Sequence, residues 1–382
     1  MPSHRFWRLV HARPPASPGE QTDPVTLAPL PPTLKGPADQ LGRPLGVLRL
    51  SLTARCNLAC PYCLPDGVEP PGLLNLAQRL RIVEAAVSLG AHSLRLTGGE
   101  PLLYPQLDAL IRAVQPLRTK GLGEVALTSN GMLLSADRAQ RLRQAGLDRI
   151  TLSLDGTTGA AVARMAGLAD EAAGARSLAQ VLAAIRHACA AGFDPAQGAL
   201  KLNAVIQRGA NDDQLLPLAQ LARERGLELR LIEFMDVGNR NGWRPEAVLN
   251  AAEMVQRIGA GWPLEPQGRP IHGTAARWSY RDGGGEGQGS RLAVVASISE
   301  PFCGDCNRLR VTADGIAYTC LFAAPGSGLD LRPWLQATSQ PEALRAALAA
   351  LWGNRRDRYS EERTERRSAA EAPHAEMAYL GG

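Results

Sequence analysis

From residue 47 onward, short segments with an apolar residue at every second position alternate with longer segments whose apolar residues recur at three- and four-residue spacing. The first pattern predicts strands and the second predicts amphipathic helices. The strand-like segments are Val47–Thr53, His92–Thr97, Glu124–Ser129, Arg149–Asp155, Leu200–Ile206 and Glu228–Phe234. The helix-like segments between them include Asn75–Leu89, Ser135–Ala145, Ser177–Ala191 and Asp212–Arg225. This order predicts repeated βα units and a parallel sheet.

The number of these units decides between an open and a closed sheet. A complete TIM barrel needs eight strand–helix units, and the pattern contains six. We therefore expect an α/β fold, an incomplete (βα)6 TIM-like barrel, with its chemistry at the carboxyl ends of the strands.

Four cationic residues occupy the polar face of these strands. Arg49 lies between Leu48 and Leu50, and its counterparts in later strands are Arg95, Lys201 and Arg230. Successive side chains of a strand point to opposite faces, so the apolar face should pack on the helices and the polar face should line the barrel interior. Burying an unpaired charge costs on the order of several kcal/mol. A single such residue could be a solvated strand end, but four at matching positions favour a site for a polyanion.

Three cysteines, Cys56, Cys60 and Cys63, follow the first strand with the spacing CxxxCxxC. One loop of this length can place three thiolates around a single metal centre. A cubane iron–sulfur cluster normally takes four thiolates, so three would leave one iron open for a ligand. A structural zinc loop would need a fourth Cys or His, and the nearest histidine in the sequence is His92, which makes zinc unfavourable here.

A second trio of cysteines, Cys303, Cys306 and Cys320, lies near the other end of the chain. A zinc knuckle completed by a distant ligand remains open. We favour a second cluster with its own open iron, because Arg308 and Arg310 follow directly and arginine forks bind phosphate with paired hydrogen bonds.

Composition narrows the class of protein. Six of the seven cysteines fall in the two trios, which indicates metal ligation in a reducing compartment rather than disulfides. The seventh, Cys189, lies on an apolar helical face and is expected in the core. The net charge of +5 among 382 residues suits an anionic substrate without indicating a nucleic-acid binder. No apolar run approaches the length of a membrane span, so we expect a cytoplasmic protein without nucleic-acid or membrane partners.

The chain divides into four parts by composition. Residues 1–43 are rich in Pro and Gly and predict a flexible arm. The partial barrel should occupy 44–262, and a smaller C-terminal domain with the second trio should occupy 263–350. Residues 351–382 form a charged segment that we expect to be solvated and that ends in Gly381 and Gly382.

Several motifs identify a resemblance. The first trio, with Tyr62 directly before its last cysteine, resembles the hallmark of the radical S-adenosylmethionine (SAM) enzymes. Further matches are Leu96–Pro101 (LTGGEP), Leu127–Gly131 (LTSNG), Ile232–Gly238 (IEFMDVG), the second trio and the Gly-Gly end. Together, from about Leu41 to Gly382, they resemble the GTP 3′,8-cyclase family of molybdenum cofactor biosynthesis. The two trios in this order, with the arginine pair and that terminus, are highly specific.

The resemblance implies a role for each matching residue. Each cysteine trio would hold one 4Fe–4S cluster. Residues matching SAM contacts are Tyr62, Gly98, Gly99, Glu100, Ser153 and Met235. Residues matching GTP contacts are Arg49, Arg95, Thr128, Lys201, Arg230, Arg308 and Arg310. The last two arginines, with Gly381 and Gly382 inserted into the active site, are the residues assigned to catalysis.

The resemblance also implies a reaction and partners. A 5′-deoxyadenosyl radical would remove hydrogen from C3′ of the GTP ribose, and attack on guanine C8 would give 3′,8-cyclo-7,8-dihydro-GTP. The enzyme would be a monomer or homodimer. It would receive electrons from a donor such as a flavodoxin or ferredoxin, and its product would pass to cyclic pyranopterin monophosphate synthase. Two alternatives remain: a radical SAM enzyme that modifies a peptide, and a zinc-stabilised scaffold.

Overall fold

The computed structural model describes residues 36–65, 67–284, 290–367 and 374–381, all within one compact unit, Lys35–Gly382. Six neighbouring strands of this unit are parallel, each paired with the next along the chain. They are β1 (Val47–Ser51), β2 (Ser93–Thr97), β3 (Glu124–Ser129), β4 (Arg149–Ser153), β5 (Leu200–Ile206) and β6 (Glu228–Glu233). The six predicted strands and their parallel order are confirmed.

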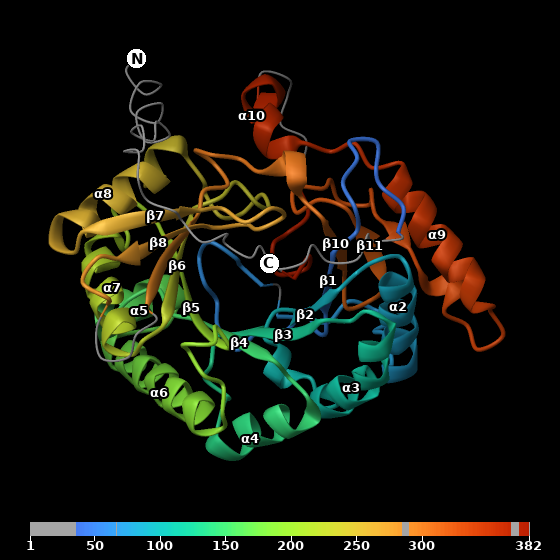
Figure 1. Ribbon diagram of the computed structural model, residues 1–382, viewed down its shortest axis with the longest axis horizontal. Helices are drawn as coiled ribbons and strands as arrows, with labels where there is room; N and C mark the ends of the chain where they lie inside the picture. Colours follow the sequence, from blue (N-terminus) through green and yellow to red (C-terminus); the bar gives the residue numbers. More distant parts are fainter. Residues whose placement is uncertain (1–35, 66, 285–289, 368–373, 382) are drawn as a thin grey trace, which may run out of the picture. The chain divides into compact units, whose positions relative to one another are not determined.

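Helices cover the outer face of this sheet (Figure 1). They are α2 (Leu76–Ser88), α3 (Leu107–Ala113), α4 (Ala136–Ala145), α5 (Gly159–Ala166), α6 (Glu171–Ala190) and α7 (Leu215–Glu224). Four of them begin where a side chain caps the first turn; for example, Asn75 accepts from the Gln78 amide before α2, and Ser135 accepts from the Arg138 amide before α4. The pattern missed α3 and α5, which are too short to show a clear period.

The division of each strand into two faces agrees with the structure. Leu48, Leu50 and Leu52 are at most 1% exposed and belong to the main apolar core. Arg49 faces the opposite way, into a cavity that Arg95 also lines. The expectation for the seventh cysteine is wrong: Cys189 is exposed, because it lies about 100° around α6 from its buried neighbour Ala188.

The C-terminal residues extend the sheet at both edges. At one edge β10 (Arg308–Val311) pairs in parallel with β1, and at the other β9 (Arg291–Val295) pairs in parallel with β6. Beyond them lie β11 (Ile316–Tyr318), β12 (Leu329–Asp330), β8 (Ala276–Tyr280) and β7 (Leu264–Gly268). The order is β12-β11-β10-β1-β2-β3-β4-β5-β6-β9-β8-β7, an open sheet in the described part of the chain.

The remaining helices are α8 (Ala251–Gly261), α9 (Pro341–Gly353) and α10 (Tyr359–Arg367). The domain division stays a prediction, although residue 350 lies inside α9 and the buried Asp39 lies in the stretch assigned to the arm. The solvated segment expected after residue 350 is wrong for the described residues, because Trp352 and Leu380 are at most 1% exposed. Composition does not predict this packing, because the few apolar residues of the segment are scattered among many charged ones.

Candidate active site

The first trio of cysteines opens onto a cavity at the carboxyl ends of β1 to β6. Cys56, Cys60 and Cys63 are free thiols, and all three line this cavity. Its lining also includes every residue that the resemblance relates to SAM, namely Tyr62, Gly98, Gly99, Glu100, Ser153 and Met235. Residues from four segments, which follow or end β1, β2, β4 and β6, therefore converge on one space.

The Gly-Gly turn after β2 packs directly against the cysteine loop. The Gly99 amide donates to the Thr53 carbonyl at 2.8 Å, and the Glu100 amide donates to the Arg55 carbonyl at 2.8 Å. A Cβ on Gly98 would lie 2.6 Å from the Thr53 carbonyl oxygen, and Gly98 has φ +147°. Glycine is therefore required, because any side chain would push the turn away from the first trio.

Glu100 stabilises this end of the sheet from inside. Its carboxylate accepts hydrogen bonds from the Leu102 amide at 2.9 Å, the Ser129 hydroxyl at 2.8 Å and the Asn130 amide at 2.8 Å. Burial raises the pKa of Glu100 to about 7, although these donors oppose the shift. The carboxylate thus joins the end of β2 to the end of β3, beside the cavity.

Tyr62 joins the cysteine loop to the far side of the same cavity. Its hydroxyl donates to Asp155 Oδ2 at 2.7 Å, and Asp155 Oδ1 accepts from the Val205 amide at 2.8 Å. Burial raises the pKa of the Cys63 thiol to about 12, so metal binding there would displace a proton.

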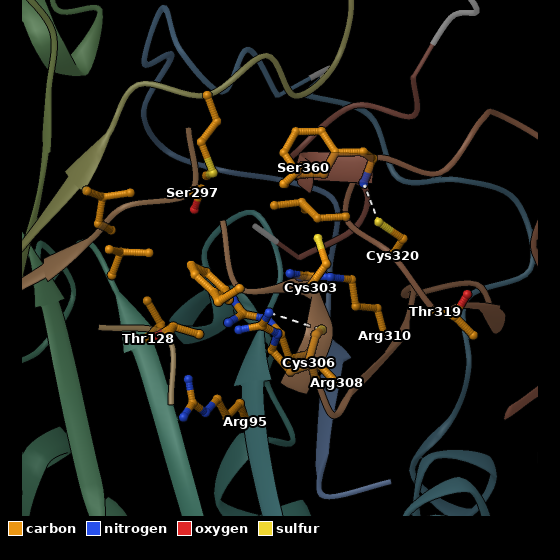
Figure 2. A pocket seen from close by; sticks show the side chains of 18 of the residues that line it. Arg95, Thr128, Ser297, Cys303, Cys306, Arg308, Arg310, Thr319, Cys320 and Ser360 are labelled. Atoms are coloured by element: carbon orange, nitrogen blue, oxygen red, sulfur yellow. Dashed lines mark hydrogen bonds between the residues drawn. The ribbon is translucent and has the colours of Figure 1, made fainter. Parts of the chain in front are cut away.

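The second trio opens onto another cavity. Cys303, Cys306 and Cys320 line it, and Figure 2 shows them with Arg308 and Arg310 beside them. Six of the seven residues that the resemblance relates to GTP line this cavity: Arg49, Arg95, Thr128, Arg230, Arg308 and Arg310. Lys201 is not among the described residues that line either cavity.

Strand register brings three guanidinium groups to one level. Arg49 of β1 is paired with Arg95 of β2 on one side and with Arg310 of β10 on the other. Burial and neighbouring guanidinium groups lower the pKa of Arg95 to about 9 and that of Arg310 to about 10. Because a guanidinium keeps its proton in proteins, these shifts mean that the crowded charge favours a bound anion. Among the described residues, Arg95 Nε and Arg310 Nη1 are buried without a hydrogen-bond partner.

One acidic residue pairs with two of the four strand cations that were expected to face the cavity without a counter-charge. Glu228, at the start of β6, lies 3.1 Å from Lys201 Nζ, 2.9 Å from Arg230 Nε and 3.4 Å from Arg277 Nε. The expectation is therefore wrong for Lys201 and Arg230, which share a counter-charge. Glu228 lies two positions before Arg230, so the strand period that identified Arg230 could also have indicated Glu228.

Sequence reasoning missed Arg149, which also lines the second cavity. Its guanidinium pairs with Glu124 at 2.8 Å and donates to the Thr151 hydroxyl at 3.1 Å. Arg149 begins β4 and has the same parity as Thr151, so the strand period contained the signal.

The two cavities adjoin. Four residues line both of them: Thr128, Asn203, Ile232 and Met235. Asn203 was not assigned a role from the sequence, yet its side-chain Oδ1 is buried without a hydrogen-bond partner among the described residues. In the sheet it lies between Ser153 of the first cavity and Arg230 of the second. The two trios therefore open toward a common junction.

The C-terminal segment contributes to the first cavity and contacts a residue of the second. Met377 lines the first cavity, and the Gly381 carbonyl accepts from Arg49 Nη2 at 2.8 Å. Tyr379 donates to Asp314 at 3.0 Å and holds the segment from the other side. Gly382, the other terminal glycine assigned to catalysis, lies outside the described residues.

Comparison with known proteins identifies the family. Residues 50–222 match the model of the Radical SAM superfamily, and residues 227–361 match that of Molybdenum Cofactor Synthesis C. The GTP 3′,8-cyclase of Synechococcus sp. (strain CC9605) is 62% identical over 352 residues, which cover 90% of this chain and 98% of that protein. The chain belongs to the GTP 3′,8-cyclase family. The family resemblance inferred from the motifs is thus confirmed.

More distant relatives agree with this family membership. The GTP 3′,8-cyclase of Xanthomonas campestris pv. campestris (strain B100) is 45% identical over 90% of this chain and 97% of its own length. A crystal structure of Streptococcus suis SuiB bound to S-adenosylmethionine has a TM-score of 0.55 and 14% identity, over 81% of this chain and 68% of that one. At that identity SuiB supports the radical SAM fold alone.

A radical SAM protein of this family uses an iron–sulfur cluster with SAM, and the first cavity suits both. Three thiols and the glycine turn face one space. In the described part of the chain, no three Cys, His, Asp or Glu side chains converge on a single metal ion; a cubane, in which each thiolate bonds a different iron, does not need such convergence. No described helix is long and apolar enough to cross a membrane.

Proposed function

We propose that the protein converts GTP to 3′,8-cyclo-7,8-dihydro-GTP in the first step of molybdenum cofactor biosynthesis. The observation that carries the proposal is the junction: two cysteine trios open onto adjoining cavities that share Thr128, Asn203, Ile232 and Met235, and the second cavity is rich in guanidinium groups. One ligand held in each cavity would meet the other at these shared residues.

In the first cavity, Cys56, Cys60 and Cys63 would hold a 4Fe–4S cluster, with Tyr62, Gly98, Gly99, Glu100, Ser153 and Met235 around SAM. The cluster and SAM together supply the group that removes a hydrogen atom from the substrate. The glycine turn leaves room for the cofactor close to the cysteine loop. Glu100 acts through the backbone amides that it binds, because its carboxylate oxygens already accept three hydrogen bonds.

In the second cavity, Cys303, Cys306 and Cys320 would hold a second 4Fe–4S cluster. Arg49, Arg95, Arg230, Arg308 and Arg310 would bind the triphosphate and guanine of GTP, with Thr128 at the junction. Arg308 Nη2 lies 3.0 Å from Cys306 Sγ, so Arg308 would contact the cluster as well as the substrate. Lys201 would act through Glu228 and the electrostatic potential of the cavity.

The chain would control the reaction by placement. With the phosphates held by arginines, the ribose would lie at the junction, where C3′ gives up its hydrogen atom and forms a bond to guanine C8. One electron from an external donor and one proton complete the product, which has the mass of GTP. The Gly381 carbonyl accepts a hydrogen bond from Arg49, which lines the second cavity, so the C-terminal segment would help to exclude water from the reacting carbon.

An isotope experiment tests this function. Anaerobically prepared protein is given GTP deuterated at C3′, SAM and dithionite. We expect an isomer of GTP and an equal amount of 5′-deoxyadenosine that carries one deuterium. Consumption of SAM without deuterium transfer, by protein with full iron content, would reject the proposal.

The proposed reaction also implies partners for the protein. A flavodoxin or ferredoxin would supply the electron in the cytoplasm, and cyclic pyranopterin monophosphate synthase would take the product. The protein would work as a monomer or homodimer. The guanidinium-rich cavity favours binding of a small anionic nucleotide over binding of a peptide.

A further inference from the structure

Four charged residues form a network beside the second trio: Asp39, Arg43, Arg355 and Asp357. Arg355 and Asp357 also line the second cavity. Asp39 Oδ2 lies 2.5 Å from Arg43 Nε and 3.6 Å from Arg355 Nη1. Arg355 Nη2 in turn lies 3.1 Å from Asp357 Oδ1. The side chains of Asp39, Arg43 and Arg355 are at most 1% exposed. Two guanidinium groups and two carboxylates thus neutralise one another, largely away from water.

The two arginines hold the loop that carries Cys303 and Cys306. Arg43 Nη1 donates to the Cys303 carbonyl oxygen at 2.7 Å. Arg355 Nη1 donates to the Cys306 carbonyl oxygen. The loop and both arginines are far apart in the sequence, so these contacts fix the loop to the packed unit rather than to its own neighbours.

The third cysteine is tied to the same network. Thr319, directly before Cys320, donates its hydroxyl hydrogen to Asp357 Oδ2 at 2.7 Å. Asp357 also accepts from Arg43 Nη1 through its backbone carbonyl at 3.0 Å. One hydrogen bond thus connects each cysteine to the network. Cys303 and Cys306 are held at their own backbone carbonyls, and Cys320 is held through the side chain of Thr319.

Stability alone is a poor reason for such a network. Buried ion pairs are often replaced by apolar residues of similar volume without loss of stability. An apolar environment is already present, because Trp352 is fully buried, stacks against Arg355 at 4.7 Å and donates to the Arg43 carbonyl at 3.0 Å. Groups that hold metal ligands in place commonly change metal affinity about 10- to 100-fold when replaced.

We propose that the network of Asp39, Arg43, Arg355 and Asp357 positions the three ligands of the second iron–sulfur cluster and raises its reduction potential through the charge of Arg355. The inference rests on the proposed function, which supplies the cluster. The network is neutral as a whole, but Arg355 is its member at Cys306, and a positive charge at that end of the cluster stabilises the reduced form. Arg355 also lines the second cavity, but its guanidinium is held by the Cys306 carbonyl, Asp39 and Asp357. It is therefore a positioning residue that acts through Cys306.

The decisive comparison uses Arg355→Met and Arg355→Lys in the full chain. For Arg355→Met we expect iron to fall from about eight toward about four per chain, and any remaining second cluster to titrate at a more negative potential by EPR. Arg355→Lys keeps the positive charge but lacks the planar fork of arginine. Its second cluster should therefore titrate closer to the wild-type potential, whereas its occupancy should still be lower than in the wild type. The signals of the first cluster should not change in either variant.

Two further variants separate this role from a general loss of folding. Arg223→Met removes another buried arginine, paired with Asp282 on the outside of the sheet at 2.6 Å, and should leave both clusters unchanged. Thr319→Val keeps the shape and removes only the tie to Cys320; it should lower second-cluster occupancy without changing the melting temperature by more than Arg223→Met does.

The outcomes are distinct. Wild-type protein with one cluster rejects the proposed function. Wild-type protein with two clusters, together with Arg355→Met and Thr319→Val proteins that also hold two at unchanged potential, rejects the positioning role. Equal loss of both clusters in Arg355→Met and in Arg223→Met also rejects it, since the effect would then be loss of folding.

Discussion

Arg49 and Gly381 are 332 positions apart in the sequence, and the guanidinium of the first binds the carbonyl oxygen of the second at 2.8 Å. Gly381 has φ +69°, and a Cβ there would lie 2.5 Å from Thr97 Oγ1. Gly381 is therefore fitted between Arg49 of the second cavity and Thr97 of the first, where only glycine can follow the backbone path.

Gly381→Ala should impair the reaction without unfolding the protein. The added methyl group would push the chain end away from Arg49 and Thr97. A shift of the chain end by about 1 Å should lower turnover at least about tenfold. Deleting both terminal glycines should have the same effect. Product formation and the melting temperature are measured together, with Gly353→Ala, which has open space around its Cα, as the control. Unchanged turnover in the Ala variant would show that the fit is irrelevant.

Arg310→Ala should weaken GTP binding while both clusters stay loaded. Arg310 lines the cavity with one buried N–H unsatisfied, and a hydrogen bond to a charged group is worth about 10- to 100-fold in affinity. Anaerobic calorimetry gives the dissociation constant, and iron analysis gives the occupancy. Arg310→Lys should recover part of the affinity only, because it lacks the fork. Full GTP affinity in the Ala variant would contradict this assignment.

GTP binding should weaken between pH 7 and pH 9. Burial lowers the pKa of Lys201 to about 8, so the free protein loses this positive charge across the interval, whereas a bound anion favours its protonated form. GTP affinity should therefore be highest below pH 8 and fall above it, by up to about tenfold at pH 9. Lys201→Arg keeps its charge throughout. An equally steep profile in that variant would assign the change to another group, such as the nucleotide.

Asn203→Leu should uncouple SAM cleavage from product formation. The buried Oδ1 of Asn203 lies where both cavities meet, so its loss should leave the ribose misplaced. We expect the ratio of 5′-deoxyadenosine to cyclised product to rise severalfold while iron content stays constant; a neutral hydrogen bond is worth up to about tenfold. Asn203→Gln tests whether reach matters. A ratio of one in the Leu variant would exclude a role at the junction.

Glu100→Ala should destabilise the protein more than Glu100→Gln. The alanine leaves the Leu102 and Asn130 amides without their acceptor, and each unsatisfied buried donor costs about 1–3 kcal/mol. The glutamine keeps one acceptor oxygen and the shape. Denaturant melts of the two variants measure the difference. Equal stability would show that the carboxylate is not the link between β2 and β3.

Periodicity alone identified the six parallel strands, because the side-chain direction of a strand repeats every two residues and is written locally in the sequence. The same rule placed Arg49 and Arg95 in the interior. It could also have found Arg149 and Glu228, which share that parity. The cysteine trios were visible because ligands in one loop must be close in sequence.

The sequence by itself thus determined the alternation of elements, the two faces of each strand and the two sets of thiols. Tertiary structure alone decided that Arg310 lies beside Arg49, since nothing local shows that β10 pairs with β1. It also decided that Glu228 neutralises Lys201 and that Arg43 and Arg355 reach the second trio. Pairing between distant segments depends on the register and packing of the whole sheet, and these leave no periodic signal in the chain.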